Sequence, residues 1–170
     1  MTQTKITLFA NFFIDNEERF KRLQFSFKSI KQIKFCEYII NIRGSYKNSV
    51  TKFLKKYIKK NLHISYLHSS QGWNYDSKKL IKLIKGKYVF QWLEDQVCMI
   101  NSKHFHFLIN DLNKKKIDLI NYSLFLNGNN IKSFKNIRLI EQKRYYHLHY
   151  DINLHKKRLE YVKKKKIKCH

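Results

Sequence analysis

Over residues 4–126, continuous apolar runs alternate with segments in which apolar residues recur every three or four positions. Four apolar runs have the length and residue types of buried strands: Thr4–Phe13, Glu37–Ile42, Leu62–Leu67 and Tyr88–Leu93. Between them, apolar residues recur every three or four positions, which predicts helices over Phe20–Ile30, Val50–Ile58 and Ser77–Ile84. Single helices between strands predict a parallel sheet covered on both faces. The expected fold class is therefore α/β, a three-layer α/β/α sandwich with a mostly parallel sheet.

The pattern is less regular after the fourth apolar run. It predicts a helix over Asn101–Leu112, strands over Ile117–Leu126 and Arg138–His149, and a basic helix over Leu154–His170. The length of the chain suits one domain. We expect a single domain over residues 1–153, followed by a basic C-terminal helix or tail over residues 154–170.

Glu94 and Asp95 directly follow the fourth apolar run. The carboxyl ends of parallel strands are where α/β proteins bind ligands, so an acidic pair there indicates a site. Acidic residues are scarce in this chain, 12 Asp and Glu against 36 Lys and Arg, which gives the placement of the pair weight. The alternative is that the two carboxylates cap the helix expected after them.

The net charge of +24 would suit a nucleic-acid or membrane partner. However, the basic residues are mostly Lys and are spread along the whole chain, without the clusters of a dedicated nucleic-acid binder. The bias towards Lys, Asn, Ile, Phe and Tyr, with 4 Gly and no Pro, is typical of proteins encoded by AT-rich genomes. We therefore expect no specific nucleic-acid partner.

The cysteines and the apolar runs indicate a compartment. Three widely separated cysteines do not form a disulfide framework and favour a reducing environment. No run approaches the roughly 18 to 20 apolar residues of a transmembrane helix. The apolar opening Ile6–Ile14 leads into acidic residues without a cleavage site, which predicts a strand and not a signal peptide. The expected location is the cytoplasm, or its membrane face if the Lys-rich residues 154–170 dock on anionic lipid.

Four segments together resemble the glycosyltransferases of the GT-A fold, specifically family-2-like members. The segments are Ile6–Asp15 with Glu17-Glu18-Arg19, Asn41–Gly44, Gly72–Ser77 and Tyr88–Asp95. The resemblance implies a nucleotide-diphospho-sugar transferase fold over roughly residues 4 to 126. Enzymes of this fold continue into an acceptor-binding half that supplies the catalytic base. At 170 residues, the chain is expected to be a short or truncated member whose base is unassigned.

The resemblance also implies residue roles for binding a nucleoside-diphosphate sugar. The first strand and the segment after it hold the nucleotide base, which implies Asn11 and Phe12. The end of the second strand contacts the nucleotide, which implies Arg43. The loop before the fourth strand packs near the sugar, which implies Trp73 and Asp76.

The acidic motif of that family holds the ribose and a divalent metal. A hard cation such as Mg²⁺ or Mn²⁺ takes carboxylate and phosphate oxygens as ligands. Side chains alternate along a strand, so one of the two carboxylates is expected to ligate. We expect Asp95 at the metal and Glu94 at the ribose or a backbone donor. The family motif separates its two Asp by one residue, whereas here the two acids are adjacent.

Simpler structural roles exist for several of these residues. Arg43 could pair with Glu37 instead of a phosphate. Trp73 and Tyr75 could stack on a base or sugar, or cover an edge of the core. The acids Asp15 and Glu18 are better explained as complements to a helix dipole than as ligand contacts.

The expected function is transfer of a sugar from a nucleoside-diphosphate sugar to an unknown hydroxyl acceptor. One alternative is a non-catalytic relic of this fold, which would bind without turnover. The other is a basic nucleic-acid-binding protein, whose affinity would collapse steeply with added salt.

Overall fold

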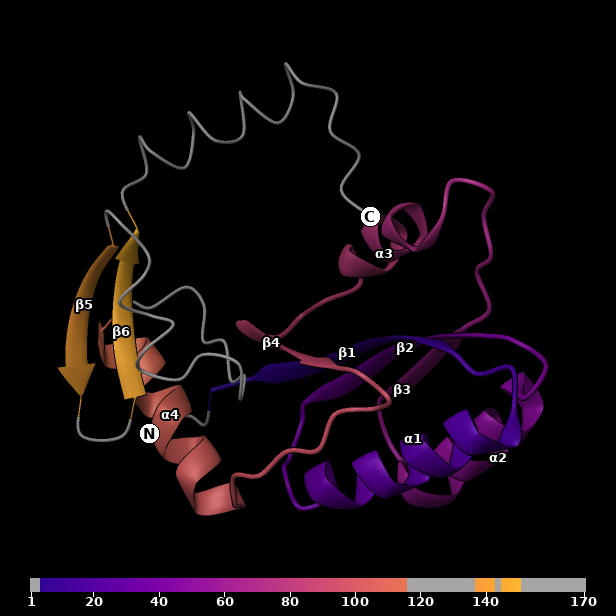
Figure 1. The fold of residues 1–170 in the computed structure, drawn as a ribbon, viewed down its shortest axis with the longest axis horizontal. Helices are drawn as coiled ribbons and strands as arrows, with labels where there is room; N and C mark the ends of the chain where they lie inside the picture. Colours follow the sequence, from indigo (N-terminus) through magenta and orange to yellow (C-terminus); the bar gives the residue numbers. More distant parts are fainter. Residues whose placement is uncertain (1–3, 116–136, 143–144, 151–170) are drawn as a thin grey trace. The chain divides into compact units, whose positions relative to one another are not determined.

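The computed structural model describes residues 4–115, 137–142 and 145–150, and the chain divides into two compact units, residues 1–118 and 119–170. The described part of the first unit contains a four-stranded sheet and four helices (Figure 1). Its elements in chain order are β1 (Ile6–Phe13), α1 (Glu17–Ile30), β2 (Glu37–Arg43), α2 (Lys47–Tyr57), β3 (Leu62–Ser65), α3 (Trp73–Ile81), β4 (Tyr88–Trp92) and α4 (Ser102–Lys115).

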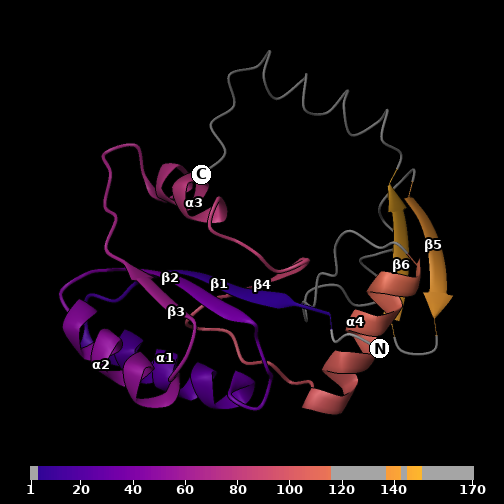
Figure 2. The same cartoon turned by 180° about the vertical axis from the view of Figure 1, so that it is seen from behind.

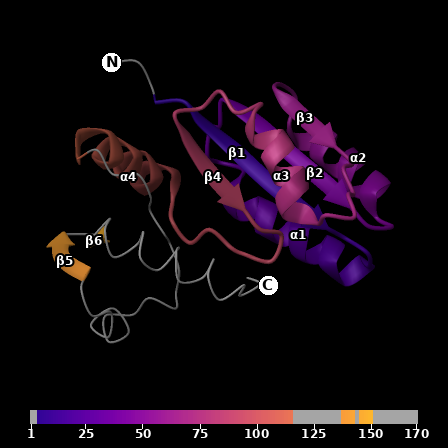
Figure 3. The same cartoon turned by 90° about the horizontal axis from the view of Figure 1, so that it is seen from above.

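The sheet of the first unit is parallel throughout, with the strand order β3-β2-β1-β4 (Figure 3). The central strand β1 pairs Phe13 with Arg43 of β2 and Ala10 with Trp92 of β4. This register brings the carboxyl ends of β1, β2 and β4 to one edge of the sheet. The predicted α/β class with a parallel sheet is confirmed.

Helices cover both faces of the sheet, so the fold has three layers: α1 and α2 lie on one face and α3 on the other (Figures 1 and 2). On the α1 face, the ring of Phe12 meets Trp92 edge-on at 4.8 Å, and Phe27 of α1 packs on Trp92 at 5.8 Å. On the α3 face, Phe9 and Ile39 pack against Leu80. The alternation of apolar side chains along β1 therefore supplies both cores.

A buried amide ties the α3 face together. The side chain of Asn41 is fully buried, and its Nδ2 donates to Asn11 Oδ1 and to Leu67 O, both over 3.1 Å. Its Oδ1 accepts from the Leu67 N–H over 2.8 Å. Asn11 Nδ2 in turn donates to Ser77 Oγ of α3 over 3.1 Å. Two neighbouring strands, the segment after β3 and α3 are thus linked by one chain of hydrogen bonds.

Helix α3 begins at Trp73, four residues before the predicted start at Ser77. Gly72 precedes it with φ of +84°, a conformation that glycine adopts without steric cost. Asp76 falls in the first turn, where a carboxylate complements the helix dipole. The apolar spacing of Leu80 and Ile84 predicts the helix but not its first turn.

The described part of the second unit is a two-stranded antiparallel hairpin. Strands β5 (Ile137–Gln142) and β6 (Tyr145–Tyr150) pair Ile137 with Tyr150 and Gln142 with Tyr145. The prediction of one strand over Arg138–His149 is therefore wrong. In the sequence, polar residues at 141 and 142 end the apolar pattern of the first strand. The strand predicted over 117–126, the tail over 154–170 and the domain boundary at 153 lie outside the described residues.

Replacing Asn41 by Leu tests the buried amide network. The change leaves Leu67 N–H and O without their side-chain partner inside the domain, and we expect it to lower the free energy of unfolding by about 2–4 kcal/mol. Urea unfolding measures this loss. Asn48→Ala, at an exposed position of α2, is the matched control and should stay within about 0.5 kcal/mol of the native chain. An equal effect of the two changes would contradict the network's role.

Candidate functional site

The ends of β1 and β2 approach closely at the carboxyl edge of the sheet. Ile14 N–H donates to Arg43 O over 2.9 Å, and Tyr46 N–H donates to Ile14 O over 3.1 Å. Gly44 makes this approach possible, because its φ is +98° and an added Cβ would overlap the carbonyl of Ile14. Since Arg43 also pairs with Phe13 in register, its side chain emerges beside the Phe13 ring.

Five side chains gather at this edge, and we call them the carboxyl-edge cluster: Phe13, Arg19, Arg43, Glu94 and Asp95. The ring of Phe13 is 40% exposed. The guanidinium carbons of Arg19 and Arg43 lie 5.5 and 5.9 Å from its centroid. Arg19 is held there by a 2.9 Å hydrogen bond from its Nη1 to Phe13 O and by a 3.5 Å ion pair with Asp15. An exposed ring flanked by two cations offers both stacking and anion-binding surfaces.

Arg43 does not pair with Glu37. The register places Glu37 opposite Thr7, near the other end of β1. There its carboxylate accepts from the Thr7 hydroxyl and from the backbone N–H groups of Lys85 and Gly86. The Nε of Arg43 is buried and has no hydrogen-bond partner among the described residues. A buried donor without a partner is costly, which makes Arg43 unusual among the side chains of this edge.

Glu94 and Asp95 are the two central residues of a turn, Leu93–Gln96, which we call the acidic turn. Gln96 N–H donates to Leu93 O over 3.2 Å and closes it. Helix α4 begins only at Ser102, and the N–H of His104 in its first turn is accepted by Asn101 Oδ1 over 2.8 Å. The alternative that the two acids cap the following helix is therefore wrong.

Burial raises the pKa of Glu94 above its usual range, and the adjacent Asp95 raises it further. The backbone N–H of Glu94 and the charges of Arg19 and Arg43 act in the opposite direction without cancelling the rise. Both guanidinium groups thus act electrostatically on the Glu94 carboxyl. Asp95, by contrast, is exposed and open to a ligand from solvent.

Three of the residues predicted from the resemblance have side chains engaged inside the domain. Phe12 is fully buried against Trp92. The Asn11 amide belongs to the network around Asn41. Asp76 is 1% exposed and accepts from the Ser69 N–H over 3.2 Å. Phe12 and Asp76 are thus closed to a ligand, whereas Asn11 is half-buried with its amide engaged within the domain.

Trp73 is 51% exposed at the start of α3, and its carbonyl accepts from Asn11 Nδ2 over 3.4 Å. Its indole is therefore free to contact a ligand. Tyr75 is 39% exposed, and the ammonium of Lys79 lies 4.5 Å from its ring centroid. Both residues are exposed, and their roles towards a ligand or an edge of the core stay predictions.

Phe13 and Arg19 were not predicted as site residues. Asn16 caps α1 by accepting from the Arg19 N–H. Glu18 lies in the first turn of α1, as the helix-dipole prediction expects, and pairs with Arg22 within the helix. Arg19 has the pattern of a solvated helix residue. The apolar pattern carries no signal for Phe13, because Ile14 directly after it is also apolar and is fully buried.

The donor set of the acidic turn suits a hard cation. Two adjacent carboxylates supply oxygen ligands, and Mg²⁺ sites usually combine one or two carboxylates with substrate phosphates and waters. Within residues 4–115 and the hairpin, no group of three or more His, Cys, Asp or Glu is arranged to hold a metal. A cation at this edge would therefore draw its remaining ligands from water or from a bound phosphate.

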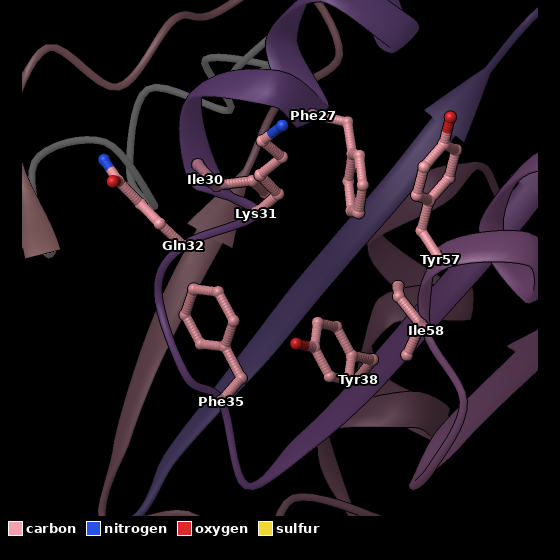
Figure 4. Close-up of a pocket in the computed structure, with 8 residues that line it drawn as sticks. All are labelled: Phe27, Ile30, Lys31, Gln32, Phe35, Tyr38, Tyr57 and Ile58. Atoms are coloured by element: carbon pink, nitrogen blue, oxygen red, sulfur yellow. The ribbon is translucent and has the colours of Figure 1, made fainter.

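A separate hollow of about 360 Å³ opens between the last turns of α1 and α2 and the start of β2 (Figure 4). Four aromatic rings, two Ile, one Lys and one Gln line it: Phe27, Ile30, Lys31, Gln32, Phe35, Tyr38, Tyr57 and Ile58. It lies on the α1 face and has no carboxylate in its lining. It is therefore distinct from the carboxyl-edge cluster.

No family model and no curated protein match the sequence. Among solved structures, the chain is similar to residues 1–349 of S. aureus TarS, a glycosyltransferase, with a TM-score of 0.49 and 12% identity. The match covers 73% of this chain and 40% of that chain, so it spans less than half of TarS 1–349. A likeness of this strength does not decide the activity. The described helices include none that is long and apolar enough to cross a membrane.

The raised pKa of Glu94 predicts a pH-dependent effect of Glu94→Gln. The native Glu94 binds its proton more tightly than the unfolded chain does, so it destabilises the fold as pH rises from its ordinary pKa through the raised native value. Glu94→Gln removes this loss, and the variant should become the more stable chain towards neutral pH. Urea unfolding from about pH 4 to about pH 8 measures the difference.

Glu17→Gln is the matched control with the opposite sign. A hydrogen bond and the charge of Lys21 lower the pKa of Glu17, so its contribution is present above the ordinary pKa and is lost as pH falls through the lowered native value. Parallel pH profiles for the Glu94 variant and the native chain would contradict the burial of Glu94.

Proposed function

We propose that the carboxyl-edge cluster binds the nucleoside diphosphate of a nucleotide sugar, and that the protein is a glycosyltransferase of the GT-A type. The observation that carries the proposal is the buried, unpartnered Nε of Arg43 beside an exposed ring and the acidic turn. A diphosphate would supply acceptor oxygens to the Arg43 guanidinium once that side chain moves to expose its Nε, and a nucleobase would supply a flat face for the ring. No single ion or simple sugar would use all of these groups.

Each side chain of the cluster would contact a different part of the nucleotide sugar. The guanidinium groups of Arg43 and Arg19 would meet phosphate oxygens in charge-assisted hydrogen bonds. Phe13 would stack on the base, since aromatic faces bind bases irrespective of their identity. Glu94 would accept from a ribose hydroxyl. Trp73 is the exposed ring available to the sugar.

Asp95 would be the ligand of a divalent cation, with Glu94 next to it. Bound together with the diphosphate, Mg²⁺ or Mn²⁺ would offset the negative charge that develops on the leaving group. Arg43 and Arg19 would add to this stabilisation as fixed positive charges at the same edge. Asn11, Phe12 and Asp76 would keep the edge in shape through backbone and packing.

The proposed reaction is a substitution at the anomeric carbon. The bond between that carbon and the diphosphate oxygen breaks, a bond to the acceptor hydroxyl oxygen forms, and the hydroxyl proton is released. None of the acids that follow the acidic turn along the chain is assigned as the base. Among them, Asp111 lies in α4 and pairs with Lys115 at 3.9 Å, and Asp118, Asp151 and Glu160 lie outside the described residues. The cytoplasmic location and the lipid-docking role of residues 154–170 stay predictions of the sequence.

A thermal-shift panel tests the binding half of this proposal. UDP, GDP, CDP and ATP are each measured with and without Mn²⁺ on the native chain, Asp95→Asn and Arg43→Ala. A ligand present at 100 times its Kd stabilises the fold by about 2.7 kcal/mol. We expect one diphosphate to raise the melting temperature in a Mn²⁺-dependent manner, and both variants to lose most of that rise.

Glu17→Gln again serves as the control, because it removes one exposed carboxylate from α1 and leaves the edge unchanged. Equal shifts with every polyanion, or a shift that Asp95→Asn retains, would contradict the proposal and leave the overall charge as the cause. Binding without transfer or hydrolysis of any nucleotide sugar would instead support the non-catalytic relic.

A further inference from the structure

Ser26 is a buried hydroxyl on the apolar face of α1, with 1% of its surface exposed. It lies between Leu23 and Phe27 in the stripe that packs on the sheet. Its partners come from β4 and the acidic turn. Trp92 Nε1 donates to Ser26 Oγ over 2.8 Å, and Ser26 Oγ donates to Gln96 O. One oxygen atom therefore links the last residue of β4 to the last residue of the acidic turn.

The hydroxyl accepts in one of these contacts and donates its proton in the other. It has one proton, and the Gln96 carbonyl is nearer than the alternative acceptor Leu93 O at 3.4 Å. A second serine on the same face of α1 extends the attachment, because Ser29 Oγ accepts from the Cys98 N–H over 2.9 Å. Through Ser26 and Ser29, helix α1 is hydrogen-bonded to Trp92 before the two carboxylates and to Gln96 and Cys98 after them.

We propose that Ser26 is a positioning residue that sets the conformation of the acidic turn and, through it, the affinity of the site. The use of that affinity for a cation and a diphosphate rests on the function proposed above. Glu94 and Asp95 lie between two residues that are fixed on the same hydroxyl. Without it, Gln96 O loses its partner and the turn is free to open. Loss of groups that orient metal ligands typically costs 10–100-fold in affinity.

Three variants separate this role from a general effect on stability. Ser26→Ala removes the hydroxyl, and Ser26→Thr retains it. Trp92→Phe destabilises the same core but leaves the hydroxyl free to donate to Gln96. Hydrogen exchange of the ligand-free protein then reports the turn directly, because Gln96 N–H closes it on Leu93 O.

We expect Ser26→Ala to speed exchange at Gln96 by about tenfold or more relative to the β1 amides, which report the sheet. Ser26→Thr should stay close to the native rate. Trp92→Phe should change Gln96 no more than it changes β1. An unchanged Gln96 rate in Ser26→Ala, or a uniform rise like that of Trp92→Phe, would overturn the inference.

The second readout is the Kd of UDP in the presence of Mn²⁺, which Ser26→Ala should weaken by about 10–100-fold. If Ser26→Ala speeds hydrogen exchange at Gln96 alone but leaves the Kd of UDP unchanged, the positioning role of Ser26 is overturned. If the native chain binds neither UDP nor the other diphosphates, the proposed function fails. In that case the exchange experiment still decides whether Ser26 holds the turn.

Discussion

The buried amide of Asn41 is the interaction on which the rest of this structure depends. A polar side chain at the centre of a parallel sheet is tolerated only when each of its groups has a partner. Here those partners are Asn11 on the next strand and the backbone of Leu67 after β3. Because this geometry is satisfied in one register only, the amide fixes how β1 and β2 align. That alignment sets Arg43 beside Phe13 at the carboxyl edge.

The carboxyl edge itself is a balance of opposed charges. Two guanidinium groups act on a partly buried carboxyl whose pKa is nevertheless raised. Burial and the adjacent Asp95 outweigh the backbone hydrogen bond and the two arginines, so the carboxyl binds its proton more tightly than usual. In the function proposed above, a diphosphate would pair with the guanidinium groups and a cation would pair with the carboxylates.

The sequence predicted most of the frame, because the change between period-two and period-3.6 spacing reports burial on a strand or a helix. Its candidates Arg43, Glu94 and Asp95 each lie at or just beyond the end of an apolar run, and in the structure Arg43 and Asp95 both act electrostatically on Glu94; their roles towards a ligand stay predictions. It did not find Arg19, whose place at Phe13 depends on how Asn16 caps α1 and turns the helix back to β1. The sequence also missed the first turn of α3, which begins at Trp73 and not at Ser77. The positive φ of Gly72 before it depends on tertiary structure.

The most direct test of the account is where Mn²⁺ binds. In amide NMR spectra of the native chain with UDP, substoichiometric Mn²⁺ broadens the signals of residues close to it. The account predicts broadening at the acidic turn and at the ends of β1 and β2, around Phe13 and Arg43, and little at the hollow beneath Tyr38 and Tyr57. Broadening spread over the whole surface, or centred away from Glu94 and Asp95, would contradict it.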